Sequence, residues 1–524
     1  MRGNLISISQ QARKFVQERD WANVMLLARQ IMVQDNNEPE GHFLYGMACK
    51  YTGQITQSIE AFKQVLALDS ERYDAAIELA FQYLVTLKHN EAFSLVSNYE
   101  KALDNSPLYL HVGAKIYSGL GMHINAWPLY VKANEIQPNV DMFKSDLASC
   151  AVLLGKVSDA KMIYQEFIDK YPLHQKNHYE LSKLEKVKTI NHIEQMKSIL
   201  DASQSSPDKN IFMYYALGKE FEDLKSWKEA FEYYDKAGKA VLSVANYNVD
   251  SDVKLINQII KTCSQKWLNS KTKRKNSIVA KQNPIFVVGL PRTGTTLVER
   301  ILSCHSEVES ADETFFLQMA IRQLSGTNGI SEVDEKIIER ASNQDIRLLA
   351  QYYMQAIKYR LSDKPMFIDK YPYNYLYLGF VAKAFPNARI VYLKRDPMDA
   401  CLAMFKQSFF KFAYSLDDLG KYYVAQDKLR NHWNVLFGDR IINVEYEALV
   451  NNQEKTTKQL LKRLGLEFEP ECLAFEKNPN ASATASTLQV REKIHTRSVG
   501  KWKYFKDDLM PLKNYLINEN IKID

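Results

Sequence analysis

The chain has 524 residues, of which 46% are hydrophobic and 25% charged, and its formal net charge is +6. These values are ordinary for a globular protein of two or three domains. The mild basic excess suits an anionic ligand and gives no indication of nucleic-acid binding. No stretch approaches the roughly 18 consecutive apolar residues of a membrane span, and the beginning of the chain lacks the apolar core of a signal peptide.

The cysteines indicate a reducing environment. The chain has six, which are scattered and include no CxxC pair: Cys49, Cys150, Cys263, Cys304, Cys401 and Cys472. Neither a disulfide framework nor a zinc site is predicted, so we expect reduced, mostly buried thiols and a cytoplasmic chain. No cluster of Asp, Glu and His side chains is typical of a metal site, and no metal is expected.

Small, aromatic and proline positions recur 34 residues apart in the first half of the chain: Ala92, Ala126 and Ala160; Gly121 and Gly155; Tyr130 and Tyr164; Pro138 and Pro172. This period and pattern resemble tetratricopeptide repeats, in which small residues let paired helices approach and stacked units share a core. We predict an all-α tetratricopeptide solenoid over residues 1–240. The resemblance implies a surface for a protein or peptide partner. A non-repeating helical bundle is the alternative.

Residues 241–283 are predicted to form a helical connector that ends in a polar linker. The run Lys271-Thr272-Lys273-Arg274-Lys275 within it is basic. A run of this kind is either a solvated linker or a patch that binds phosphate or nucleic acid, and the solvated linker is favoured.

A strand-loop-helix pattern begins at Pro284. An apolar run stops at Gly289, a short loop containing Arg292 follows, and residues 297–302 have the pattern of a helix. Such a turn presents backbone N–H groups and a helix N-terminus to a phosphate-like anion. The loop lacks the Gly-Lys-Ser/Thr of a Walker A sequence, which argues against ATP hydrolysis.

A second strand is predicted over residues 388–393 and runs into Arg395, which again precedes a helical stretch. Two strands of this kind predict an open α/β domain with a parallel, P-loop-like sheet, whose ligands bind beyond the carboxyl ends of the strands. Arg292 and Arg395 would then converge on one ligand with two anionic groups, because the planar guanidinium binds oxyanions in a bidentate manner.

Further polar residues follow in a fixed order: Glu313, Lys370, Tyr446, Ser486 and Lys501. With the two arginines they resemble the sulfotransferases that use 3′-phosphoadenosine 5′-phosphosulfate (PAPS), and above all the tyrosylprotein sulfotransferases. In layout the chain is similar to bacterial proteins that join tetratricopeptide repeats to such a domain. The resemblance covers residues 284 to about 505, and we place a PAPS-dependent sulfotransferase domain at residues 284–524.

The resemblance implies a role for each matched residue. The 5′-phosphosulfate would be held by the side chain of Arg292 and by the backbone amides of the loop, those of Arg292, Thr293, Gly294, Thr295 and Thr296. Glu313 would be the general base that takes the proton of the acceptor hydroxyl. Lys370, Arg292 and Ser486 would stabilise the charge around the transferring sulfuryl group. Arg395 and Lys501 would bind the 3′-phosphate, and Tyr446 and Ser486 would lie against the cofactor.

Two departures from the family pattern bear on the function. Ala403 stands where the family has a serine, which removes one phosphate hydrogen bond unless Lys406 or a backbone amide replaces it. Phe315 and Phe316 stand where the tyrosine-specific enzymes carry basic residues, which puts an acidic peptide acceptor in doubt and favours an apolar wall. The acceptor is therefore a hydroxyl of a protein tyrosine, a carbohydrate or a small molecule.

Beside the choice of acceptor, two alternatives stay open at this point. A tetratricopeptide adaptor whose nucleotide domain binds but does not turn over is the alternative from another class, and Ala403 favours it. A phosphoryl-transfer P-loop enzyme is the least supported. Asp396 and Asp399 are expected to cap the following helix or to orient loops, not to carry chemistry.

Overall fold

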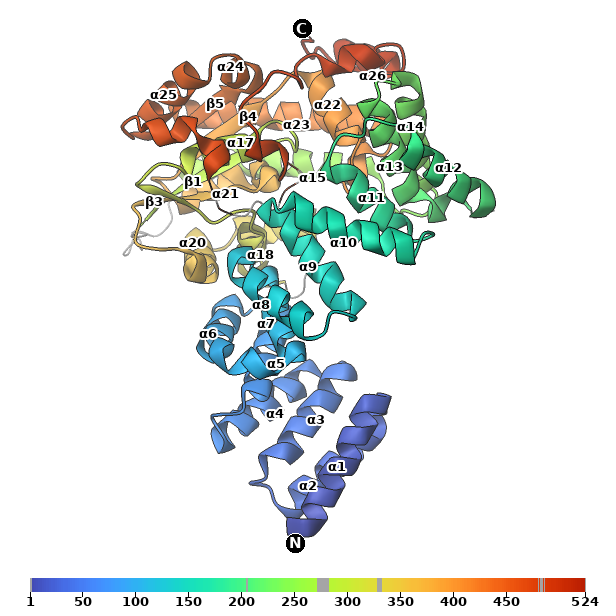
Figure 1. Ribbon diagram of the computed structural model, residues 1–524. Coiled ribbons are helices and arrows are strands. Elements are labelled where there is room, and N and C mark those ends of the chain that lie inside the picture. Colours follow the sequence, from blue (N-terminus) through green and yellow to red (C-terminus); the bar gives the residue numbers. More distant parts are fainter. Residues whose placement is uncertain are drawn as a thin grey trace. The chain divides into compact units, whose positions relative to one another are not determined.

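A computed structural model describes residues 2–203, 206–270, 282–327, 332–478, 480, 484 and 486–523 (Figure 1). The chain divides into two compact units, Met1–Leu154 and Gly155–Asp524. The basic run at residues 271–275 lies outside the described residues. No helix in the described ranges is long and apolar enough to cross a bilayer. Five of the six thiols are buried and Cys304 is partly buried, as predicted.

The first unit is a series of short helices in which successive members pack against each other. They are α1 (Arg2–Glu18), α2 (Trp21–Gln34), α3 (Pro39–Tyr51), α4 (Ile55–Leu68), α5 (Tyr73–Val85), α6 (His89–Tyr99), a 3-10 turn (Glu100–Asn105), α7 (Pro107–Gly119), α8 (His123–Ile136) and α9 (Asp141–Leu154). A Cβ atom on Gly46 of α3 would lie 2.7 Å from the ring of Phe62 of α4. Only the smallest residue allows this approach, so the predicted pairing of small and aromatic positions is confirmed.

The second unit begins with more helices of the same kind: α10 (Val157–Lys170), α11 (Gln175–Leu184), α12 (Asn191–Ser203), α13 (Ile211–Asp223), α14 (Trp227–Leu242), α15 (Val249–Thr262) and α16 (Gln265–Asn269). The close approach recurs between Gly218 of α13 and Tyr234 of α14, where a Cβ atom would lie 2.8 Å from the ring.

These helices share one hydrophobic core with the sheet that follows. Tyr215, Tyr234, Phe286 and Trp433 belong to a single cluster of buried side chains. The rings of Phe231 in α14 and of Phe405, the last residue of α22 (Pro397–Phe405), stack 5.5 Å apart. The compact unit thus includes helices that the sequence assigned to the repeat array. The domain limits at residues 240 and 284 remain a prediction.

The sheet has five parallel strands in the order β2-β3-β1-β4-β5. Their bounds are β1 (Asn283–Gly289), β2 (Val308–Ser310), β3 (Met366–Asp369), β4 (Arg389–Lys394) and β5 (Ile441–Glu445). Central β1 is buried on both faces, since Ile285 and Val287 enter one core and Phe286 and Val288 the other. A continuous apolar run suits this position. The predicted parallel α/β sheet is therefore confirmed.

Helices cover both faces of the sheet (Figure 1). They are α17 (Thr295–Leu302), α18 (Phe316–Leu324), α19 (Glu335–Ser342), α20 (Ile346–Ile357), α21 (Leu378–Ala384), α22 (Pro397–Phe405), α23 (Leu416–Phe437), α24 (Tyr446–Asn451), α25 (Gln453–Leu464) and α26 (Met510–Asn518). Because the strands are parallel, the loops that follow β1, β3, β4 and β5 meet at one edge of the sheet, where the predicted site residues lie.

Candidate active site

The loop between β1 and α17 has an unusual backbone. Gly289 has φ +148° and Gly294 φ +98°, and Arg292 between them has φ +67°, a conformation that is costly for a residue with a side chain. The turn ends at Thr295, the first residue of α17. The N–H groups of the first helical turn have no carbonyl one turn earlier to bond with, so this loop can present them to an anion.

Thr293 differs from its neighbours in the loop. Its side chain is 3% exposed, and its hydroxyl donates to the carbonyl of Leu290 at 2.7 Å. Its amide N–H also points back to that carbonyl, at 3.3 Å. Thr293 therefore shapes the loop from inside, and its predicted contact with a cofactor stays a prediction.

Arg292 is held from one side. Its Nη1 donates to the Ser486 hydroxyl at 2.6 Å and its Nη2 to Gln489 Oε1 at 2.9 Å. Its Nε is buried and has no hydrogen-bond partner among the described residues. Burial and the nearby charge of Arg395 lower the pKa of Arg292 to about 10. A partly desolvated guanidinium with an unused donor fits an oxyanion ligand.

Arg395 lies next to this loop and is 8% exposed. Its Nη1 donates to the carbonyl of Arg292 at 3.0 Å and its Nη2 to that of Ser498 at 2.5 Å. The guanidinium lies 4.8 Å over the ring of Tyr446, and a Cβ atom on Gly294 would lie 2.7 Å from that same ring. Like Arg292, Arg395 has a buried Nε with no hydrogen-bond partner among the described residues.

Asp399, on α22, holds the loop that carries Lys501. Its two carboxylate oxygens accept from the backbone N–H groups of Gly500, at 2.6 Å, and Trp502, at 2.9 Å. Asp396 caps α22, since its side chain accepts from the N–H of Asp399 at 2.8 Å. The prediction that these two aspartates cap a helix and orient a loop is confirmed.

A cluster of opposite charges lies near Ala403. Lys406 Nζ is 2.9 Å from Glu222 Oε1, and Lys501 Nζ forms an ion pair with the same oxygen. The other oxygen of Glu222 accepts from the hydroxyl of Tyr234 at 3.1 Å. Glu222 belongs to α13, so a helix that precedes the sheet contributes a charged group beside the predicted phosphate site.

Lys370 lies between two carboxylates. Its Nζ is 2.6 Å from Glu313 Oε1 and 3.3 Å from Glu299 Oε2. Burial lowers the pKa of Lys370, but the two glutamates outweigh it and hold the pKa above its usual value. Lys370 is fully buried, whereas Glu313 keeps 25% of its side chain exposed. The lysine therefore fixes a carboxylate whose other oxygen has no hydrogen-bond partner among the described residues.

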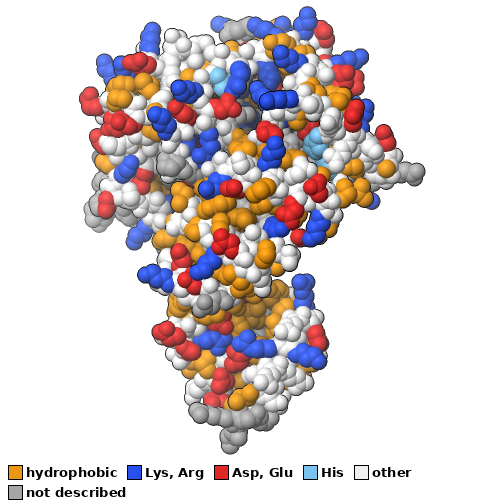
Figure 2. Space-filling model, viewed as in Figure 1, with side chains coloured by type: hydrophobic (Ala, Val, Ile, Leu, Met, Phe, Trp, Pro, Cys, Tyr) orange, Lys and Arg blue, Asp and Glu red, His pale blue; other side chains and the backbone are white. Residues whose placement is uncertain are grey.

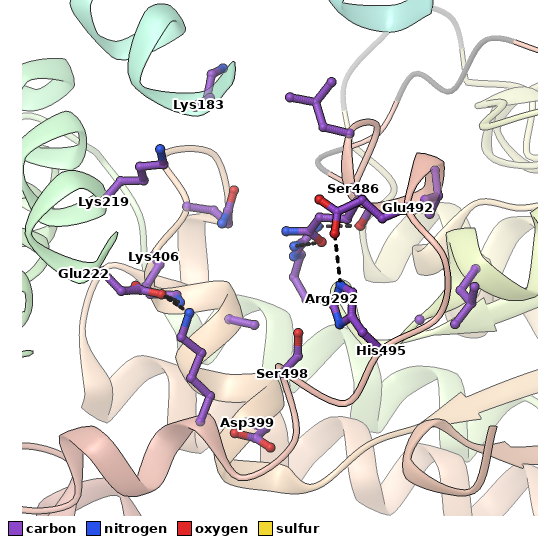
Figure 3. A pocket seen from close by; sticks show the side chains of 18 of the residues that line it. Lys183, Lys219, Glu222, Arg292, Asp399, Lys406, Ser486, Glu492, His495 and Ser498 are labelled. Carbon is purple, nitrogen blue, oxygen red and sulfur yellow. Dashed lines mark hydrogen bonds and ion pairs between the residues drawn. The ribbon is translucent and has the colours of Figure 1, made fainter. Parts of the chain in front are cut away.

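Two cavities meet at this site. The larger holds about 390 Å³, and eight Lys or Arg side chains against five Asp or Glu line it among the described residues. The smaller holds about 270 Å³, and Glu313 lines it. Both are lined by Arg292, Gly294 and Ser486, so they share one wall. Figure 2 shows Lys and Arg side chains around a hollow on the second unit, and Figure 3 shows Arg292 and Ser486 together at the larger cavity.

The smaller cavity has aromatic walls, formed by Tyr371, Tyr373, Phe409 and Phe410. Phe315, which the sequence placed at an acceptor wall, is 57% exposed and packs edge-on against Tyr371 at 5.0 Å. The other residue predicted there, Phe316, is 5% exposed and belongs to the core of the second unit. The prediction that Phe316 lines an acceptor wall is therefore wrong. Phe316 is the first residue of α18, and this helix turns the side chain into the core.

Comparisons with known proteins agree with this geometry. Residues 284–470 match the model of the Sulfotransferase family. A protein-tyrosine sulfotransferase of Drosophila melanogaster is 23% identical over 272 residues, which are 49% of this chain and 54% of that protein. An uncharacterized protein of Aquifex aeolicus (strain VF5) is 26% identical over 427 residues, 78% of this chain and 54% of that protein. This chain therefore spans about half the length of these two curated relatives.

Among solved structures, a sulfotransferase domain from the curacin biosynthetic pathway is similar to this chain, with 19% identity and a TM-score of 0.34. The match covers 46% of this chain and 99% of that domain. The family match falls on the parallel sheet and its Arg292 and Arg395 loops, and the paired helices with the 34-residue period precede it. Residues 284–470 are thus similar to the sulfotransferase family, and they follow an array of tetratricopeptide-type helical repeats.

Proposed function

We propose that this chain is a sulfotransferase that uses PAPS as donor and an aromatic hydroxyl as acceptor. The observation that carries the proposal is the pair of cavities, one basic and one aromatic, that share Arg292, Gly294 and Ser486. A donor and an acceptor bound in two adjoining cavities bring the reacting groups together at the shared wall.

The larger cavity fits a doubly anionic nucleotide. Two arginines with unused buried donors, Arg292 and Arg395, line it together with Lys406 and Lys501. When bound, PAPS supplies the sulfuryl group. The side chain of Arg292, oriented by Ser486, supplies positive charge where negative charge collects in the transition state.

Glu313 is the general base of this proposal. It lines the aromatic cavity, and its carboxylate accepts the proton of the acceptor hydroxyl, which typically accelerates such a reaction ~10²–10⁴-fold. Lys370 keeps the carboxylate in place through the 2.6 Å contact. Lys370 is fully buried and is not among the lining residues of either cavity, so in this proposal it acts on the reaction through Glu313.

The acceptor is inferred from the walls of the smaller cavity. Tyr371, Tyr373, Phe409 and Phe410 present ring faces and edges, which pack well against another ring. Arg292 is the one Lys or Arg side chain among the described residues that line this cavity. A phenolic hydroxyl, such as that of a protein tyrosine without acidic neighbours, therefore fits better than a carbohydrate.

The experiment is transfer of labelled sulfate from PAPS to three acceptors: a neutral tyrosine peptide, a simple phenol and a sugar alcohol. We expect label on the first two, with the product identified by mass spectrometry. Glu313→Gln removes the base and should lower kcat at least a hundredfold, whereas Glu307→Gln, an exposed carboxylate after α17, serves as the matched control. Full activity of Glu313→Gln would contradict the assignment of the base.

A second candidate function is an adaptor that binds the nucleotide without turnover, and the missing hydroxyl at Ala403 favours it. Tight binding of PAPS with no transfer to any acceptor in a cell extract would support the adaptor. In either case we propose that the repeat array holds a protein or peptide partner. Retention of a binding partner by the chain on an affinity column would test that proposal.

A further inference from the structure

A carboxylate from outside the segment that matches the family lies at the basic cavity. Glu222, near the end of α13, is paired with Lys406, the residue that directly follows α22, and with Lys501. Figure 3 shows Glu222 and Lys406 on the wall that lies across the cavity from Arg292. The family match covers residues 284–470, so it includes neither α13 nor Lys501.

We propose that Lys406 is a further residue that binds the 3′-phosphate of the nucleotide, and that Glu222 is the positioning residue that holds Lys406 and Lys501 for it. This inference rests on the proposed function. Ala403 lies in the last turn of α22, Lys406 directly follows that helix three positions on, and both line the cavity. The long side chain of Lys406 thus covers the place where the hydroxyl at position 403 is missing.

The charges in this corner favour an anion. Arg395, Lys406 and Lys501 contribute three positive charges, and Glu222 and Asp399 contribute two negative charges, which leaves +1. A phosphate monoester carries about −1.5 to −2 at neutral pH. Without Glu222 three cations would face one another in a partly buried corner, an arrangement that disfavours their charged forms.

Glu222 is itself held in place. One oxygen serves both lysines and the other accepts from Tyr234 of α14. Burial raises the pKa of Glu222, but Lys406 and Lys501 outweigh it and lower the pKa to about 2. The carboxylate therefore stays ionised throughout the physiological range. Each ammonium group uses one of its three protons on Glu222, so two remain for a phosphate.

The test compares adenosine 3′,5′-bisphosphate with adenosine 5′-monophosphate by calorimetry on the full chain. The wild-type protein should prefer the bisphosphate. Lys406→Gln should reduce that preference ten- to a hundredfold, the loss expected for a hydrogen bond between charged groups, and Lys406→Arg should retain most of it. Lys411→Gln, an exposed lysine beyond the cavity, is the matched control.

Glu222→Gln keeps the shape of the side chain but removes its charge. Lys406 then loses a proton more readily, so we expect the bisphosphate to bind much as in the wild type at pH 6.5 and at least fivefold more weakly at pH 8. A role in folding alone would change affinity equally at both pH values, and that outcome would overturn the positioning role. Glu229→Gln, an exposed carboxylate on α14, is the control.

The outcomes separate the two proposals. A wild-type chain that binds both nucleotides equally, or neither, refutes the proposed function together with this inference. A wild-type preference that survives Lys406→Gln refutes the inference alone. If Lys406→Gln does not fold, proton uptake by the wild-type chain on binding the bisphosphate gives the same answer without a variant, and its absence at pH 8 refutes the role of Lys406.

Discussion

The sharpest prediction concerns the pH dependence of nucleotide binding. Burial and the positive charges of Lys501 and Arg292 lower the pKa of Lys406 to about 8, although Glu222 opposes them. A bound 3′-phosphate stabilises the charged ammonium and so raises this pKa. Protonated Lys406 is then the form that binds, and affinity is retained below pH 8 and lost as pH rises through it.

The expected size of the pH effect follows from the pKa of about 8 for Lys406. At pH 8 about half of the Lys406 side chains are neutral, so binding should take up about half a proton per nucleotide. Between pH 7 and pH 9 the affinity should fall about tenfold. Calorimetry in two buffers of different ionisation enthalpy measures the uptake directly, and titrations across this range measure the affinity.

Lys406→Gln is the critical comparison, because it removes the titrating group and should flatten the profile. Arg292, with a pKa of about 10, stays charged over this range and does not contribute. A wild-type affinity for adenosine 3′,5′-bisphosphate that is the same at pH 7 and pH 9, with no proton uptake, would refute the reasoning.

Three further predictions concern residues that shape the cavities. Gly294→Ala should weaken nucleotide binding about tenfold because its Cβ atom would press on Tyr446. Gly465→Ala is the control, because Gly465 has a similar positive φ but no atom within 4 Å of the added Cβ. It should lower only the melting temperature, through backbone strain, whereas Gly294→Ala should also lower the nucleotide affinity measured by calorimetry. Asp399→Ala leaves the backbone N–H groups of Gly500 and Trp502 without their acceptor. We expect the free energy of unfolding, measured with urea, to fall by about 1–3 kcal/mol. The affinity for the bisphosphate should also fall, because Lys501 lies between these two residues. Phe410→Ala should raise KM for an aromatic acceptor several-fold and leave calorimetric nucleotide binding unchanged.

The sequence allowed the local parts of this site to be predicted. The Arg292 loop depends on residues that are neighbours in the chain, and its glycines reveal a turn with positive φ. Parallel strands then bring Arg395 to the same edge as Arg292. The capping role of Asp396 was also predictable, because a short side chain directly before a helix has few other uses.

Contacts between distant segments could not be predicted in the same way. Lys406 and Glu222 are 184 positions apart, and no repeat pattern indicates which carboxylate of α13 faces the cavity. Glu299 was missed as the second partner of Lys370 because a glutamate inside a helix usually faces solvent. Phe316 was placed wrongly because a pair of adjacent aromatics does not reveal which ring the following helix turns inward.

The shared core of α13, α14 and the sheet limits how such a protein can evolve by exchange of modules. A repeat array joined to an enzyme is often regarded as an interchangeable accessory. Here the last helices of the array pack against α22 through Phe231 and Phe405, and α13 contributes Glu222 to the basic cavity. Tyr179 and Lys183 of α11 also line that cavity. Recombination that replaced these helices would remove part of the cavity wall, so exchange of repeats is compatible with an intact cavity only upstream of α11.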